Sequence, residues 1–219
     1  LSGLGDQQIV DPWRDRDMRL YLIRHGQTDW NVAGRIQGST DIPLNDTGRQ
    51  QAACLAKGMA NRPVTQVFCS TLSRAYETAA AIGESQDVPV CRLSELEEVN
   101  YGKWEGLTME EIRKRYPKEL EQWYLSPVEV APPGGETQTQ VYERCKRAVA
   151  RILDQAKGDV AVVSHGATVV FLLEYMLEGT GRSEEDDIIV GNASISTVEY
   201  DRESKRFALR QLNDREHLK

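Results

Sequence analysis

Two of the chain's three histidines occupy matching positions, each near the end of a short apolar run. His25 follows the run at 20–23 after one arginine, Arg24, and His165 follows the run at 160–163 after one serine. Such runs are typical of buried strands in a parallel sheet, and ligands bind these sheets at their carboxyl edge. A lone histidine there is more often a packed polar side chain. Two in the same context favour a functional site.

Two arginines are expected at the same edge, and they suit an anionic ligand. Arg24 ends the first apolar run, and Arg74 falls in the first turn of a helix predicted over 74–85. Either Thr71 or Ser73 is placed to cap that helix. Guanidinium groups present forked donors that match a phosphate or a carboxylate. A positive pocket is compatible with the net charge of −7, because local arginines set the local potential.

These residue types fit phosphoryl transfer. A neutral imidazole at His25 is a competent nucleophile towards phosphorus, and a phosphohistidine divides a difficult hydrolysis into two steps. His165 could donate to the same phosphoryl oxygens as charge moves. We expect Gly26 to let the backbone approach the ligand closely, with its N–H group as a further donor.

An acid must also protonate the departing alkoxide. The concentrated carboxylates beside the predicted site elements are Glu95, Glu97, Glu98 and Glu105. Most glutamates are exposed, so the residues alone leave open whether this group acts in catalysis or forms a solvated acidic loop.

The order of predicted elements indicates an α/β domain. Helical patterns separate the first four strand-like runs, and a long amphipathic helix is predicted over 136–156. Short helices are predicted near 108–116 and 118–124, inside an insertion at 99–135 that we interpret as a lid. We therefore predict one three-layer α/β/α domain, with a mostly parallel central sheet and helices on both faces. The strand-like runs are at 20–23, 67–69, 89–93, 160–163, 195–200 and 207–212.

Composition limits the remaining possibilities. The chain has 219 residues, which we divide into an N-terminal extension at 1–17, poorly ordered and either natural or added, and one domain at 18–219. The acidic balance argues against nucleic acid as a partner. Because no apolar stretch spans a bilayer and no secretory signal is present, we expect a cytoplasmic protein with no membrane partner. Four widely spaced cysteines, expected to be reduced and buried, indicate no metal site.

The residues around the first histidine resemble a known family. Residues 24–31 read Arg-His-Gly-Gln-Thr-Asp-Trp-Asn, similar to the Arg-His-Gly-(Glu or Gln)-Thr-x-Trp-Asn signature of the histidine phosphatase superfamily. The resemblance is to the branch with cofactor-dependent phosphoglycerate mutases and small phosphatases such as α-ribazole phosphatase. It extends from Met18 to about Val198. Further matches lie at 35–38, 41–44, 47–48, 51–52, 70–75, 77–79, 96–106, 134–136 and 164–166.

The resemblance implies a phosphoglycerate mutase-like fold and a role for each matching residue. His25 matches the phosphorylated nucleophile, and Glu98, two places after Leu96, matches the proton donor. Glu97 occupies a variable place, and no metal or other cofactor is implied. Catalytic roles are implied for His25, Glu98, Arg24, Arg74 and His165. Contacts to substrate or phosphate are implied for Arg24, Asn31, Gln37, Gly38, Arg74, Tyr101, His165 and Gly166.

Three positions carry no implied role in the reaction. Trp30 and Trp104 match aromatic positions that we interpret mainly as packing. His217 matches nothing, and we expect a solvated residue of the tail. The acidic run at 184–187 would border the entrance or form a solvated loop.

Three functions remain open at this point. The first is hydrolysis of a small phosphate ester, and the second is a mutase that returns the phosphoryl group to another hydroxyl of its ligand. The resemblance favours hydrolysis, because the mutases carry a longer insertion between the acid and the second histidine, whereas Glu98 and His165 are 67 positions apart. The third is a non-catalytic module that binds a phosphorylated ligand, which intact nucleophile, acid and arginines disfavour. Association into a homo-oligomer stays open.

Overall fold

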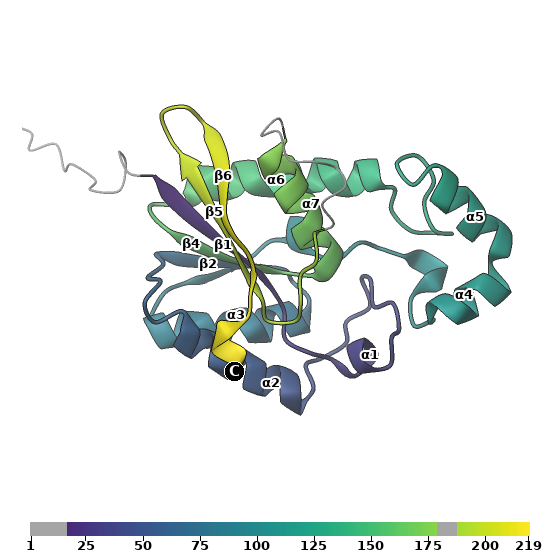
Figure 1. Cartoon of the computed structure of the whole chain (residues 1–219), viewed down its shortest axis with the longest axis horizontal. Helices are drawn as coiled ribbons and strands as arrows, with labels where there is room; N and C mark the ends of the chain where they lie inside the picture. The colour runs from purple at the N-terminus through teal and green to yellow at the C-terminus, as the bar shows by residue number, and fades with distance from the viewer. Residues whose placement is uncertain (1–16, 179–187) are drawn as a thin grey trace, which may run out of the picture.

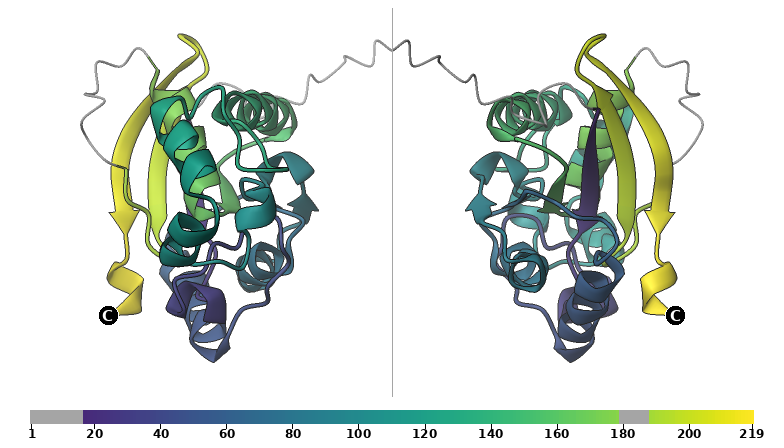
Figure 2. Two further views of the ribbon diagram at one scale, coloured as in Figure 1. Left: turned by 90° about the vertical axis from the view of Figure 1, so that its right-hand side faces the viewer. Right: turned by 90° about the vertical axis from the view of Figure 1, so that its left-hand side faces the viewer.

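The computed structural model describes residues 17–178 and 188–219. The predicted extension at 1–17, except for its last residue, and the acidic run at 184–187 lie outside them. Six strands form one sheet in the order β3-β2-β4-β1-β5-β6, with the hairpin of β5 and β6 at one edge and β3 at the other (Figure 2). The strands are β1 Met18–Arg24, β2 Gln66–Cys69, β3 Val90–Arg92, β4 Val160–Ser164, β5 Ile195–Asp201 and β6 Arg206–Asp214.

The strand pairing explains why the two histidines meet. β1 and β4 are parallel neighbours, and Arg24 at the end of β1 pairs with Ser164 at the end of β4. His25 and His165 therefore leave adjacent strands at the same level of the carboxyl edge. β2 pairs parallel with β4 and with β3, whereas β5 runs antiparallel to β1. The prediction of a mostly parallel sheet is confirmed.

Helices cover both faces of the sheet, with α2 and α3 on one side and α6 and α7 on the other (Figure 1). Asn45 caps α2 by accepting a hydrogen bond from the backbone N–H of Gly48. The predicted inner face of α6 is buried over its whole length, from Val141 to Ile152. The helices are α1 Asp29–Val32, α2 Asp46–Gly58, α3 Ser73–Gln86, α4 Met109–Arg115, α5 Pro117–Leu125, α6 Gln138–Gln155 and α7 Gly166–Leu177.

The alternation of strand side chains divides the interior into two cores. Leu20, Leu22 and Phe68 pack under α6 and α7, whereas Tyr21 and Ile23 pack under α2 and α3. Residues of one strand thus fill opposite faces of the sheet, as the period of two in a strand requires. The predicted α/β/α layering is confirmed.

The insertion has a small core of its own beyond the carboxyl edge of the sheet. Trp104, Ile112 and Leu120 are buried in it, against side chains from α4 and α5. A single β-bridge between Arg35 and Thr108 ties the insertion to the loop after β1. In Figure 1 the insertion stands opposite the end of the sheet at which β1 begins, so it faces the ends of β1 and β4.

Two expectations about local structure were wrong. Neither Thr71 nor Ser73 caps α3 with its side chain, because the N-cap is Leu72. A carboxylate from a distant loop does so instead: Asp41 Oδ1 accepts hydrogen bonds from the N–H of Ser73 at 2.8 Å and from its hydroxyl at 2.7 Å. Of the four cysteines, all free thiols, only Cys69 and Cys145 are buried, whereas Cys54 and Cys91 are partly exposed.

His217 also differs from its expected place in a solvated tail. It lies in a short 3-10 helix, Glu216–Leu218, and its Nε2 is 2.9 Å from the carbonyl oxygen of Ala193. Its Cβ is so close to Gly58 of α2 that a side chain at Gly58 would collide with it. The third histidine therefore anchors the C-terminal segment on α2.

Candidate active site

His25 lies immediately after β1 and is buried, with 2% of its surface exposed. Its Nδ1 is 2.6 Å from the carbonyl oxygen of Gly26. Because a carbonyl oxygen only accepts, Nδ1 must carry the proton, which leaves the lone pair of the neutral ring on Nε2. Burial, and then the positive charges of Arg74 and Arg24, hold the pKa of His25 well below its ordinary value. The neutral ring thus keeps a lone pair on Nε2.

His165 has the opposite tautomer. Its Nδ1 lies 3.2 Å from Nε of Arg74, which only donates, so the proton of the neutral ring is on Nε2. This Nε2 is buried and has no hydrogen-bond partner among the residues that the structure describes. Burial first, and then the neighbouring His25 and Arg74, hold the pKa of His165 well below its ordinary value. The two rings meet edge to face, with centroids 5.1 Å apart, so a lone pair and an N–H donor lie together.

The two arginines are held in place by backbone carbonyl groups. Arg24 Nη1 donates to the carbonyl oxygen of Val190 at 2.8 Å, while its Nε is buried and finds no partner within 17–178 and 188–219. Arg74 is buried at the start of α3, and its Nη1 and Nη2 donate to the carbonyl oxygens of Thr40 and Gly38, each at 2.8 Å. Each guanidinium group keeps further N–H donors for an anion.

The predicted site residues meet at one cleft of about 470 Å³ between the sheet edge and the insertion. His165 is buried beneath it in contact with His25. A larger surface hollow of about 690 Å³ beside β5 and β6 contains none of the predicted residues. The predicted residues that line the cleft are Arg24, His25, Asn31, Gln37, Gly38, Arg74, Glu98, Tyr101 and Gly166.

The Glu98 carboxylate lies against the N-terminus of α7, the helix that begins directly after His165. Its oxygens accept hydrogen bonds from the N–H of Thr168 at 3.1 Å and of Ala167 at 3.3 Å. These are two of the N–H groups that an α-helix leaves unpaired at its first turn. Glu98 therefore caps α7 and faces the cleft at the same time.

The other three glutamates of the acidic group point elsewhere. Glu95 pairs with Arg151 on the surface, at 3.4 Å. Glu97 bonds to the hydroxyl of Thr71, and Glu105 binds the loop after α1. Of these four glutamates, Glu98 is the one that lines the cleft.

Asn31 is oriented by three donors that converge on its Oδ1. They are the N–H and hydroxyl of Thr28 and the Nδ2 of Asn192, each at 3.1 Å. The side-chain N–H₂ group of Asn31 is therefore the part left for a ligand. Asn192 also donates to the carbonyl oxygen of His25, at 3.1 Å. Asn192 was not predicted from the sequence. The available signal was the strand-like run at 195–200, because residues just before a strand that is antiparallel to β1 lie beside the end of β1.

Glu105, for which the sequence left a role open, is a second positioning residue. Its carboxylate accepts hydrogen bonds from the backbone N–H groups of Ser39 at 2.9 Å, Thr40 at 3.0 Å and Tyr101 at 3.1 Å. This holds the loop whose carbonyl groups bind Arg74. The loop turns at Gly38, whose φ of +55° favours glycine and whose missing side chain leaves room for Glu105.

The expected role of Gly26 was wrong. Its N–H donates to the hydroxyl of Thr78 at 3.1 Å, so it is not available to a ligand. A Cβ at this position would lie 2.5 Å from the carbonyl oxygen of Gly48. Glycine is needed here because the start of α2 packs against it.

Fold and cleft together define an α/β protein in which Arg24 and Arg74 surround a buried histidine at the carboxyl edge of the sheet. The chain belongs to the histidine phosphatase superfamily (branch 1), whose family description matches residues 20–215, and is a phosphatase of that family. The sequence-based identification of the family and of its fold is confirmed.

Individual relatives agree with this assignment. Phosphoserine phosphatase 1 of Hydrogenobacter thermophilus is 32% identical over 92% of this chain and 94% of its own length. Glucosyl-3-phosphoglycerate phosphatase of Mycobacterium tuberculosis is 34% identical over 74% of this chain and 77% of its own. The crystal structure of a putative alpha-ribazole-5'-P phosphatase from Escherichia coli has a TM-score of 0.81 at 28% identity, and covers 91% of this chain and 98% of its own.

Two other kinds of site are absent from the described residues. Within 17–178 and 188–219, no three His, Cys, Asp or Glu side chains gather as a metal-binding group. No helix in these ranges has the length and apolar character to cross a membrane.

Proposed function

We propose that the chain hydrolyses small phosphate monoesters in two steps, with His25 as the phosphorylated nucleophile. In the first step, the lone pair on Nε2 attacks phosphorus and the bond to the ester oxygen breaks. Arg24, Arg74 and the Nε2–H of His165 donate hydrogen bonds to the phosphoryl oxygens. The N–H₂ group of Asn31 is placed to add a further donor.

Glu98 completes both steps in this proposal. Its carboxylic acid gives a proton to the departing oxygen, and the resulting carboxylate then takes a proton from water as the water attacks the phosphohistidine. Phosphate and free His25 are the products. Arginine and histidine supply the charge stabilisation that Mg²⁺ provides in other phosphoryl-transfer sites, so we expect no metal or other cofactor to be required.

The observation that carries this proposal is the hydrogen bond between Nδ1 of His25 and the carbonyl oxygen of Gly26. It leaves Nε2 unprotonated, and the lowered pKa of His25 keeps the ring neutral in mildly acidic solution. A histidine that only bound phosphate would serve better as a charged donor. The geometry therefore supports nucleophilic attack over simple binding.

The intermediate is tested by trapping it. Brief reaction with a labelled phosphomonoester, followed by denaturation, should leave phosphate that is lost in acid and retained in alkali. His25→Ala should abolish both labelling and turnover, whereas His217→Gln, which alters a histidine outside the cleft, should label normally. Label on a serine or an aspartate would contradict the assignment.

A mutase is the second candidate, since one relative, from Arabidopsis thaliana, is named phosphoglycerate mutase-like protein 4 and is 36% identical over 71% of this chain. Both reactions pass through a phosphohistidine, so trapping does not separate them. Release of phosphate and isomerisation of 3-phosphoglycerate should be measured in parallel. We expect phosphate release to dominate; rapid isomerisation with little release would favour the mutase.

A further inference from the structure

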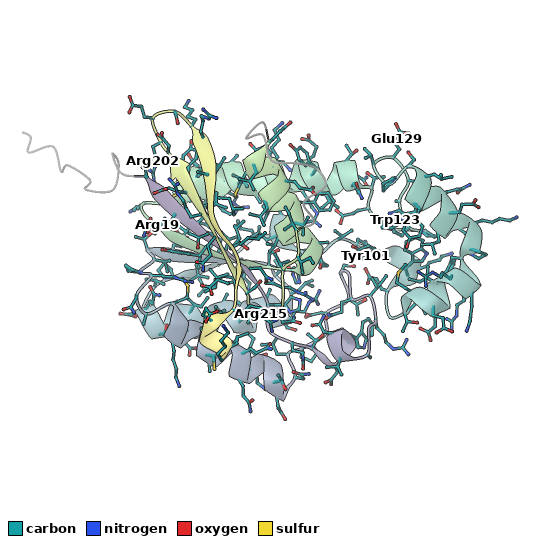
Figure 3. The ribbon with its side chains drawn as sticks, viewed as in Figure 1. Arg19, Tyr101, Trp123, Glu129, Arg202 and Arg215 are labelled. Atoms are coloured by element: carbon teal, nitrogen blue, oxygen red, sulfur yellow. The ribbon has the colours of Figure 1, made fainter. Side chains whose placement is uncertain are left out.

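The cleft has a second half that the proposed phosphate contacts do not use. Its lining comes from the insertion and from the loop that the insertion bridges. Trp104 and Trp123 meet edge to face with ring centroids 5.7 Å apart, and Figure 3 shows Tyr101 and Trp123 on the side of the insertion that faces the sheet. We call this lining the aromatic wall; its members are Ile36, Tyr101, Trp104, Met109, Trp123 and Tyr124.

Charge near the aromatic wall is already balanced. Apart from Arg24 and Arg74 at the phosphate end, Arg35 is the one cation among the described residues that line the cleft. Its Nη1 bonds to Oε2 of Glu111 at 2.9 Å. Glu111 is itself fixed, because the same oxygen accepts the N–H of Thr108 at 2.8 Å. The second half of the cleft therefore offers no unpaired positive charge to a ligand.

Two uncharged polar atoms beside the aromatic wall have no hydrogen-bond partner in the described part of the chain. Oε1 of Gln37 is an acceptor and Nε1 of Trp104 is a donor, and both are buried without a hydrogen bond. Only 8% of Gln37 and 1% of Trp104 are exposed, and both residues line the cleft. Buried polar groups are nearly always paired, so these atoms are suited to an uncharged hydroxyl or amide group of a ligand.

We propose that the preferred substrates are phosphate esters of uncharged alcohols with a flat apolar or aromatic body. This inference rests on the proposed function and specifies its leaving group. An aromatic or apolar body is stabilised against the wall by removal of its surface from water and by ring contacts. An ester that carries a carboxylate would bring a second anion to a surface without a free cation, and an unpaired charge is costly to remove from water.

A panel of three primary alkyl esters tests the proposal: ethyl phosphate, phenethyl phosphate and 3-phosphoglycerate. All three esters have a primary alkoxide as leaving group, so each needs a proton from the enzyme. Differences in kcat/KM between them therefore report contacts in the part of the cleft that holds the leaving group. We expect kcat/KM for phenethyl phosphate to exceed that for ethyl phosphate about tenfold or more, as apolar pockets discriminate on this scale. 3-Phosphoglycerate should be no better than ethyl phosphate.

Two variants test the parts of the argument separately. Trp123→Ala should reduce the ratio of phenethyl to ethyl phosphate about tenfold, whereas Leu125→Ala, on the same helix but 79% exposed, should leave the ratio unchanged. Glu111→Gln keeps the bond to Thr108 but releases the charge of Arg35. It should raise the ratio of 3-phosphoglycerate to ethyl phosphate about threefold to tenfold.

The possible failures are distinguishable. If no phosphate ester is hydrolysed and no phosphohistidine forms, the proposed function itself is wrong. If hydrolysis proceeds through His25 but 3-phosphoglycerate exceeds ethyl phosphate about tenfold in kcat/KM, the leaving-group proposal is overturned while the mechanism stands. An unchanged phenethyl preference in Trp123→Ala, or an unchanged 3-phosphoglycerate ratio in Glu111→Gln, would likewise overturn it.

Discussion

Lowering the pH should destabilise the fold, because His25 and His165 are buried in the neutral form. Burial is the main cause that holds the pKa of each well below its ordinary value of about 6.5, and the neighbouring arginines add to it. In the unfolded chain each histidine regains an ordinary pKa and binds a proton below it. Between the folded-state and unfolded-state pKa values, the unfolded chain holds more protons than the folded protein. The two histidines therefore do not reduce the free energy of unfolding above about pH 6.5, and they reduce it progressively as the pH falls below that value.

The size of the effect follows from these two residues. A histidine that stays neutral in the fold costs about 1.4 kcal/mol of stability at one pH unit below its unfolded pKa. His25 and His165 together should therefore lower the free energy of unfolding by about 3 kcal/mol between about pH 7.5 and about pH 5.5. His217, whose pKa is also lowered by burial, adds a smaller decrease.

Urea unfolding at the two pH values measures this, in buffers free of phosphate because a bound anion would stabilise the fold. In His25→Asn the pH-dependent loss should shrink by about 1.4 kcal/mol, and in His217→Gln by less. Equal pH dependence in wild type and His25→Asn would refute the assignment of His25 as a buried neutral imidazole.

Three further outcomes are expected. Glu98→Gln should slow hydrolysis of alkyl phosphates about 100-fold or more, whereas the step in which an activated aryl phosphate phosphorylates His25 should be slowed much less, because its leaving group scarcely needs a proton. Glu97→Gln should be nearly silent on both, and a larger leaving-group-dependent loss in that variant would reassign the acid. Activity should survive exhaustive chelation; loss in EDTA that a divalent ion restores would contradict the metal-free mechanism. Glu105→Gln should weaken inhibition by inorganic phosphate about tenfold, since the loop that holds Arg74 loses an acceptor, and unchanged inhibition would remove Glu105 from the positioning residues.

The sequence predicts well whatever depends on neighbouring residues in the chain. Alternation in the strands places Leu20 and Tyr21 on opposite faces, and the 3.6-residue period of α6 places Val141 and Ile152 on its inner face. The matching sequence contexts of the two histidines are also enough to predict that the two side chains lie close together, because parallel neighbouring strands bring equivalent ends to the same edge. These patterns are local, so they survive without knowledge of the rest of the fold.

Contacts between distant segments could not be predicted in this way. Asp41 caps a helix 32 residues further on, and Asn192 reaches the carbonyl group of His25 across 167 residues. The sequence context of Gly26 suggests a glycine that contacts a ligand, whereas in the structure the backbone of Gly48 leaves no room for a side chain at this position. In each case one polar or small residue contacts a partner whose position depends on the packed fold. No periodicity in the sequence distinguishes such a residue.

The different roles that we propose for the two histidines follow from such contacts and not from their sequence contexts, which are similar. A carbonyl group fixes the proton of His25 on Nδ1, and the guanidinium group of Arg74 fixes the proton of His165 on Nε2. One ring thereby presents a lone pair and the other a donor, which attack on phosphorus and stabilisation of its oxygens require. Exchange of these partners would exchange the tautomers and remove both roles. The burial that keeps both rings neutral for this chemistry is the same burial that makes the fold sensitive to acid, so activity and stability should respond together when either environment is altered.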